Sequence, residues 1–151
     1  MAKRKIPLQV GDIVKIDLGD KAFCFGRVLE EPLIAFYDLK TSEVPDMEAI
    51  VELPILFRVW VMNDAVTSGR WPVIGNMSLS PDLEVAPKFF KQDPISKTFS
   101  IYYGEKETPA TLAECEKLER AAVWDPSHVE DRLRDYYLGI PNQWVESLKA
   151  Q

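Results

Sequence analysis

The sequence contains few of the residues on which metal and redox sites depend. Among its 151 residues are one histidine, His128, and two cysteines, Cys24 and Cys115, which are far apart in the chain. Zinc sites need several histidine or cysteine ligands gathered together, so no convincing zinc set can be assembled and we expect no metal and no cofactor. The two cysteines form neither a CxxC pair nor a closely spaced framework. We expect two buried free thiols in a reducing compartment.

Motifs for phosphate binding and catalysis are also missing. The chain has no Walker loop, no GxGxxG and no DxDxDG-like calcium loop. No serine or cysteine at a recognisable elbow accompanies His128, which we expect to face solvent at a helix start. The pairs Glu30–Glu31 and Glu105–Glu107 could serve a glycosidase, but acidic residues are common here and solvated faces are the better interpretation. We therefore expect no enzymatic activity.

Long apolar runs are absent, and the charge is predominantly of one sign. No run approaches the roughly 18 residues of a membrane span, and the basic start MAKRK leads into IPLQVGD without a secretory apolar region. These features predict a cytoplasmic protein that does not enter a membrane. The net charge of −6 argues against direct contact with nucleic-acid backbones and for a basic protein partner.

The composition is that of one folded domain. Apolar residues make up 46% of the chain, no internal repeat or low-complexity tract occurs, and the prolines are scattered. A chain of this length can bury about 70% of the surface that its unfolded form exposes. We predict a single domain over residues 1–151, with residues 1–9 as a flexible or weakly packed terminus.

The first forty residues show the alternation of half-buried strands. Apolar residues recur at every second position from Asp12 to Leu18, and Gly19-Asp20 is suited to a tight turn. The runs AFCFGRVLE and LIAFYDL follow, which predicts a three-stranded antiparallel meander. Further strands are predicted in ILFRVWVM, from Trp71 onward and in TFSIYY, with β-structure ending at about Gly104.

Helices are expected in three places. The segment SEVPDMEAIVEL suits a short helix, while NDAVTSGR has the composition of a loop. Thr111 with Glu114, and Ser127 with Glu130, match the capping box of a helix start. The last helix has a stripe of Val129, Leu133 and Tyr136 or Tyr137 and a stop at Gly139. The fold class is α+β, with a curved antiparallel sheet packed by C-terminal helices.

Two residues in the strands call for a structural or a functional interpretation. Arg27 shares its strand parity with Phe23, Phe25 and Leu29, so it should point inward, where a buried ion pair with a carboxylate is favoured over anion binding. Trp71 follows a Ser-Gly-Arg turn and precedes a short apolar run. A core tryptophan is favoured there over a ligand-binding one.

The order of the motifs resembles the immunity protein 26 family of bacterial polymorphic toxin systems. The resemblance extends from about Val10 to Trp144. It is carried by the ordered set Gly11-Asp12, Phe25-Gly26-Arg27-Val28, Trp71 with Ile74-Gly75, and Glu119-Arg120-Ala121-Ala122-Val123-Trp124.

This resemblance implies a cytoplasmic antidote that binds a cognate toxin domain and performs no catalysis. The acidity suits a basic toxin such as a nuclease. Glu43, Asp46 and Glu48 are candidate toxin contacts, because they occupy a proline-marked excursion between strands. The motif residues are expected to be structural: Gly11, Asp12, Gly26, Arg27, Trp71, Gly75, Glu119 and Trp124. Both a monomer and a homo-oligomer fit the sequence.

Two alternatives of other classes remain open. The N-terminal meander also looks like a small SH3-like barrel, which would make the chain a peptide- or nucleic-acid-binding module. Its negative charge weakens the nucleic-acid version. A small hydrolase acting through carboxylates is the third possibility, and no specific motif supports it.

Overall fold

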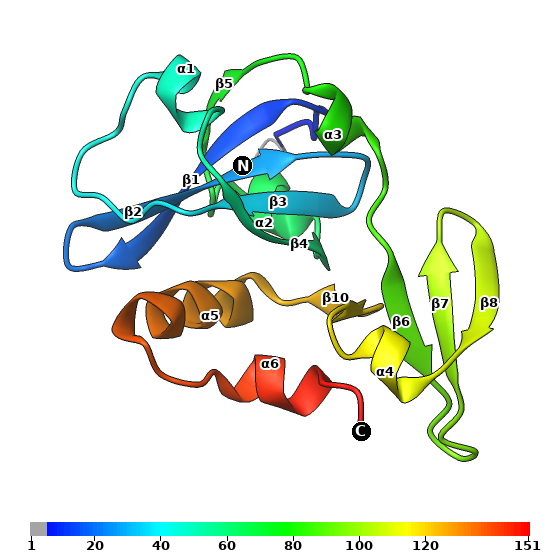
Figure 1. The fold of residues 1–151 in the computed structure, drawn as a ribbon. Coiled ribbons are helices and arrows are strands. Elements are labelled where there is room, and N and C mark those ends of the chain that lie inside the picture. The colour runs from blue at the N-terminus through cyan, green and yellow to red at the C-terminus, as the bar shows by residue number, and fades with distance from the viewer. Residues whose placement is uncertain (1–5) are drawn as a thin grey trace, which may run out of the picture.

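The structure is a computed structural model that describes residues 6–151. It confirms the α+β class, with two sheets in place of the single one expected (Figure 1). The larger sheet has the strand order β10-β4-β3-β2-β1-β5 and the smaller one β8-β7-β6-β9. The larger sheet consists of β1 (Asp12–Gly19), β2 (Ala22–Val28), β3 (Leu33–Tyr37), β4 (Ile55–Val61), β5 (Val73–Asn76) and β10 (Val123–Trp124).

The smaller sheet corrects the expectation that β-structure ends near Gly104. It consists of β6 (Phe89–Gln92), β7 (Phe99–Tyr103), β8 (Lys106–Ala110) and β9 (Glu119–Arg120). β9 pairs in parallel with β6, and β10 then pairs in parallel with β4 of the larger sheet. One short stretch of chain therefore joins the two sheets. Two-residue strands leave too little periodicity in the sequence to be predicted.

The predicted N-terminal meander is confirmed, since β1, β2 and β3 pair antiparallel in chain order. The tight turn lies one residue later than expected. Gly19 pairs with Ala22, and Asp20 and Lys21 have φ angles of 51° and 59°. These are the central residues of a two-residue hairpin turn, whose twist matches that of the flanking strands.

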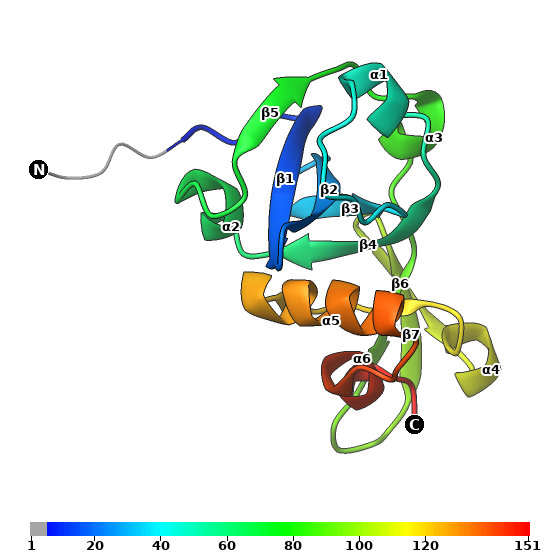
Figure 2. The ribbon, with the colours of Figure 1, turned by 90° about the vertical axis from the view of Figure 1, so that its left-hand side faces the viewer.

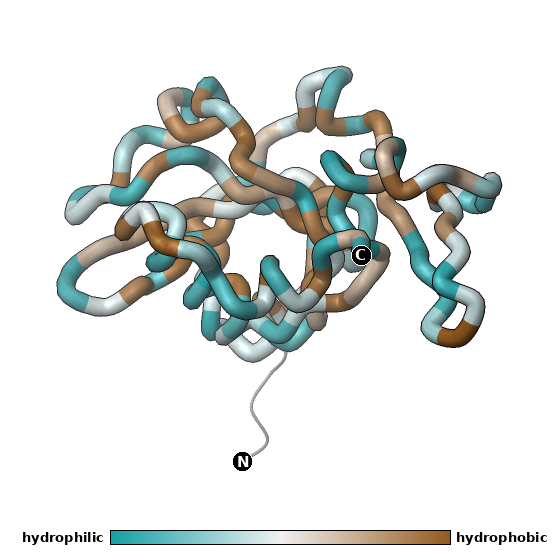
Figure 3. Tube along the Cα trace, turned by 60° about the horizontal axis from the view of Figure 1, so that its bottom comes forward, coloured by the Kyte–Doolittle hydropathy of each residue, from teal (hydrophilic) through white to brown (hydrophobic). Residues whose placement is uncertain are grey.

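Both faces of the larger sheet are buried. On one face, Val14, Ile16 and Phe36 pack against Trp71 and against Val129 and Leu133 of the longest helix. On the other face, Ile13, Phe25 and Tyr37 pack against Ile50. Hydrophobic positions recur along the chain through the body of the molecule, whereas many outer turns are hydrophilic (Figure 3). The larger sheet thus forms the centre of the fold.

Six helices occur in the described part of the chain. They are α1 (Met47–Ile50), α2 (Asp64–Thr67), α3 (Pro81–Glu84), α4 (Leu112–Cys115), α5 (Pro126–Leu138) and α6 (Gln143–Leu148). α5 crosses beneath the larger sheet, and α6 lies beyond it (Figures 1 and 2). The loop expected from NDAVTSGR contains α2, and α3 and α6 were not predicted.

The helix caps agree with the sequence in two places and differ in one. Thr111 and Glu114 form the expected capping box of α4, and Gly139 ends α5 in the left-handed conformation with φ 70°. The N-cap of α5 is Asp125, whose side chain accepts from the Ser127 amide, and not Ser127 itself. Pro126 already begins the helix, so Glu130 is free for another role.

Three further expectations can be compared with the structure. Residues 1–5 of the predicted weakly packed terminus lie outside the described residues; beyond them, the Ile6 amide donates to the Thr67 carbonyl and Leu8 packs against the core. Cys24 and Cys115 are both free and buried. Among residues 6–151, no helix is both long and apolar enough to cross a bilayer.

Candidate functional site

The predicted acidic contacts lie on the segment that joins β3 to β4. Glu43, Asp46 and Glu48 are all exposed, and Asp46 is the N-cap of α1. Glu52 is also exposed, and residues 41–54 contain no lysine or arginine. The structure therefore brings four acidic side chains onto one short excursion without a cation of its own. We call residues 41–54 the acidic segment.

The acidic segment is held against the sheet by its apolar side chains. Ile50 is fully buried with Ile13, Phe25 and Tyr37. Met47 lies directly over Gly75 of β5, where an added Cβ would overlap its sulfur atom. A residue without a side chain lets another element approach the strand closely. Gly75 therefore has a packing role that positions α1.

Arg27 is buried, as its strand parity indicated, but its partners differ from those expected. It is 1% exposed and forms no ion pair with any carboxylate in residues 6–151. Its guanidinium donates to the Gly11 carbonyl at 2.9 Å, to the Tyr37 hydroxyl at 2.9 Å and to the Met77 and Ser78 carbonyls. The expected buried ion pair is thus wrong. Carbonyl and hydroxyl oxygens, and no carboxylate, accept the hydrogen bonds that the guanidinium N–H groups donate.

Gly11 and Asp12 complete this connection between β1 and the chain after β5. Gly11 has φ +93°, and a Cβ there would lie 2.5 Å from the Met77 carbonyl oxygen. Only glycine combines that backbone conformation with so close an approach. Asp12 is 4% exposed and accepts from the Asn76 side chain at 2.9 Å. These contacts hold the segment from Asn76 to Ser78 in place.

Trp71 lies in the core on the opposite face, with no exposed surface. Its indole N–H donates to Glu130 Oε2 at 2.9 Å, and Arg70 donates to both Glu130 oxygens at 2.9 and 2.8 Å. Burial alone would raise the pKa of Glu130, but the hydrogen bonds from Arg70 and Trp71 outweigh it and lower the pKa. Sequence reasoning missed this site, although Glu130 shares a helix stripe with Val129 and Leu133.

The remaining motif residues lie in packed positions. Gly26 leaves room for Val14 and Ile34, whose methyl groups would lie 3.1 and 3.3 Å from a Cβ there. Glu119 receives two hydrogen bonds of 2.9 Å from Arg132 of α5. Trp124 is 4% exposed, and the guanidinium of Arg132 lies 5.1 Å from its ring centre.

The described residues offer little reactive chemistry. His128 is half-buried and its ring stacks on that of Trp144, with the ring centres 3.6 Å apart. The expectation that His128 faces solvent is therefore wrong. Burial raises the pKa of the Cys24 thiol to about 12, which leaves it a poor nucleophile. Burial and a hydrogen bond to Asp38 also raise the pKa of Tyr137. Within residues 6–151, no three histidine, cysteine or acidic side chains are arranged to hold a metal ion.

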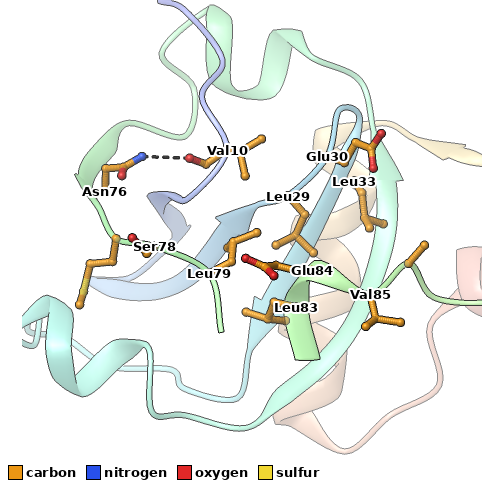
Figure 4. Close-up of a pocket in the computed structure, with 12 residues that line it drawn as sticks. Val10, Leu29, Glu30, Leu33, Asn76, Ser78, Leu79, Leu83, Glu84 and Val85 are labelled. Atoms are coloured by element: carbon orange, nitrogen blue, oxygen red, sulfur yellow. Dashed lines mark hydrogen bonds between the residues drawn. The ribbon is translucent and has the colours of Figure 1, made fainter. Parts of the chain in front are cut away.

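A groove lies where the two sheets meet. One part, of about 440 Å³, runs between the turn after β2 and the chain around α3 (Figure 4). A second part, of about 320 Å³, continues between that turn and the end of β7. Both parts are lined by Glu30, Leu33 and Ala86, so they are contiguous. We call this feature the junction groove; neither its aromatic nor its acidic lining was predicted as a site.

Comparison with known proteins supports the resemblance seen in the sequence. The family model described as Immunity protein 26 matches residues 9–101. The match covers β1 to β6 and ends within β7, so it does not include Glu119 or Trp124. Neither the curated proteins nor the solved structures contain a match. Since the family model matches more than half of the chain, the protein belongs to the immunity protein 26 family.

Proposed function

We propose that this protein neutralises one cognate toxin domain by binding it in a stable complex. Inhibition is by occupation of the toxin surface and not by catalysis, and it takes place in the cytoplasm of the cell that is protected. Membership of the immunity protein 26 family supports the role. The observation that carries the mechanism is the acidic segment, an exposed excursion with four acidic residues and no cation.

The toxin domain that fits this surface is basic, as a nuclease would be. Complementary fields accelerate encounter and fix orientation, even where each exposed ion pair adds little affinity. Glu48 lies on α1, Asp46 is its N-cap and Glu43 precedes it, while the inward residue of this helix, Ile50, supplies the attachment to the core. Contacts to the toxin can therefore be made without disturbing the packing of the sheet.

The test is to express the candidate toxin domain, sought in the adjacent gene, in cells with and without the protein. Growth should be rescued, and the purified pair should bind with nanomolar affinity through an interface of about 1,600 Å². The association rate should fall as salt is raised. Absence of both rescue and binding would contradict the proposal, whereas rescue with a salt-independent rate would remove only its electrostatic part.

A charge-reversal variant tests the place of contact. Replacing Glu43, Asp46 and Glu48 by lysine should slow association by about tenfold or more at low salt. The control carries the same charge change at exposed acids elsewhere, Asp64, Glu116 and Glu146. Equal association rates for the two variants would place the interface away from the acidic segment.

A further inference from the structure

We propose that the junction groove receives an arginine- or lysine-bearing segment of the toxin domain. This inference rests on the proposed function and deepens it by assigning a second contact surface and the chemistry of its occupant. The groove combines aromatic rings, apolar walls and carboxylates, and each of these features favours a cation on an apolar stem.

The aromatic part of the groove is built from three rings on both sheets. Trp60 of β4 is partly buried, and its ring lies 4.7 Å from Phe89 and 5.8 Å from Tyr102. All three line the second part of the groove. Tyr102 already attracts a cation within the protein, because the Lys91 ammonium lies 4.5 Å from its ring centre. Guanidinium and ammonium groups bind such rings through their negative faces.

The charged side chains that line the groove are all acidic. Glu30, Glu31, Glu84 and Glu105 line its two parts, and no lysine or arginine does. None of the four forms an ion pair within residues 6–151, although Glu31 accepts a hydrogen bond from Asn63. Elsewhere in the fold, Glu119 and Glu130 are each bound bidentately by an arginine. An incoming arginine could make the same kind of contact in the groove.

The walls of the groove are fixed by internal hydrogen bonds. Arg27 holds the Met77 and Ser78 carbonyls on one side. The Leu33 amide donates to the Glu30 carbonyl at 2.8 Å and closes the turn after β2. Arg58 donates to the Val85 carbonyl at 2.9 Å on the other side. A groove that needs little ordering loses less free energy when a partner binds.

The groove is also placed to act together with the acidic segment. α1 and α3 lie at the same end of the molecule in two perpendicular views (Figures 1 and 2). Two exposed apolar side chains also line the groove: Val10 is 57% exposed and Val85 is 54% exposed. Exposed apolar side chains beside carboxylates match the apolar stem and charged end of lysine and arginine. A partner steered by the acidic segment can thus insert a basic side chain into the groove at the same end of the molecule.

The experiment titrates the toxin domain found by the rescue test above with three variants. Glu30→Lys combined with Glu105→Lys reverses two groove charges, and Ala86→Trp fills the shared wall without changing any charge. Glu116→Lys combined with Glu146→Lys is the charge-matched control on exposed sites outside the groove. We expect the first variant to weaken binding by about 100-fold and the second by about tenfold, with the control within about threefold of the wild type.

The outcomes separate this inference from the proposed function. No binding by the wild type would overturn both. If the wild type binds and both groove variants bind with unchanged affinity, the assignment of the junction groove as a contact surface is overturned, while the proposed function stands. Thermal melting of each variant identifies any that fails to fold, and amide exchange of the wild-type complex then decides the question. Protection of residues 29–33, 84–87 and 102–105 is expected, and its absence overturns the groove.

The same exchange experiment tests the chemistry of the occupant. The protected segment of the toxin domain should contain an arginine or a lysine. Replacing that residue by glutamate should weaken binding to the wild type and restore binding to the Glu30→Lys and Glu105→Lys variant. A protected segment that contains neither residue would overturn the assignment.

Discussion

The two sheets differ in how completely they are covered. All five residues of β3 in the larger sheet are buried, whereas four of the five residues of β8 in the smaller sheet are exposed. The larger sheet is packed on both faces, and the smaller one contributes mainly Phe89 and Phe90 to buried positions. The comparison indicates that the larger sheet contributes most of the free energy of folding, whereas the smaller sheet mainly contributes solvent-exposed side chains.

The largest expected difference is in amide exchange. Buried strands exchange only when the whole domain unfolds, while exposed strands open locally at lower free-energy cost. We expect β3 amides to exchange about 1,000-fold more slowly than those of β8. Exchange measured by NMR gives both rates in one sample. Equal protection in the two strands would show that the sheets unfold as one unit, which would contradict the proposed difference in stability between them.

Arg27→Met is the substitution expected to destabilise the larger sheet most. The variant leaves the carbonyls of Gly11, Met77 and Ser78 buried without the guanidinium that satisfies them. We expect a loss of about 3 kcal/mol in the free energy of unfolding, measured by urea denaturation. A loss below about 1 kcal/mol would mean that water replaces the guanidinium.

Glu130→Gln and Glu107→Gln compare ion pairs in the two regions. Glu130 is 7% exposed and bound to Arg70 and Trp71, whereas Glu107 pairs with Lys91 on the surface. Glu130→Gln should cost about 2 kcal/mol at neutral pH, because it weakens charge-assisted hydrogen bonds to a buried carboxylate. Glu107→Gln should leave the melting temperature unchanged, since solvent screens exposed pairs.

The pH dependence provides a second readout of Glu130. Its pKa is lowered in the folded protein, so its contribution to stability is complete above its unfolded pKa. That contribution decreases as the pH falls through the folded pKa, because protonation then removes the charge that Arg70 and Trp71 bind. Wild type and Glu130→Gln should therefore converge in stability at acidic pH. If the free energies of unfolding of the two proteins differed by the same amount at every pH, the loss of stability in acid would belong to groups other than Glu130.

Gly75→Ala is expected to destabilise the protein less than Arg27→Met or Glu130→Gln. The new methyl group would collide with the Met47 side chain, which can shift at a cost of about 1 kcal/mol. The Met47→Ala background removes the collision, so the same substitution should cost little there, and a double-mutant cycle measures the coupling. Additive effects would show that α1 does not depend on Gly75 for its position.

Strand periodicity predicted most of the larger sheet. Alternation from Asp12 to Leu18 correctly gave the buried parity of β1. The parity that Arg27 shares with Phe25 and Leu29 likewise predicted that it is buried. In the smaller sheet β7 was predicted but β8 was not, because four of the five residues of β8 are exposed and no alternation of apolar and polar positions arises. Strands of two residues, such as β9 and β10, are stabilised by distant partners and leave no local pattern.

The candidate site was only partly accessible from the sequence. The exposed position of the acidic segment followed from its proline and its charges. The junction groove could not be predicted, because Glu30, Trp60 and Tyr102 are distant in the chain and meet only where the sheets join. The partners of Arg27 were missed for a related reason: backbone carbonyls are present in every sequence and give no signal of where they gather.

The partners of Arg27 have a consequence for cooperativity. Its hydrogen bonds reach residues 16, 10, 50 and 51 positions away in the chain. No single hairpin can satisfy them, because they require β1, β2, β3 and the chain after β5 to be assembled together. A partly assembled sheet would bury the guanidinium with too few acceptors, at a high free-energy cost. The arginine thus acts against partial structures and makes the assembly of the larger sheet more nearly all-or-none.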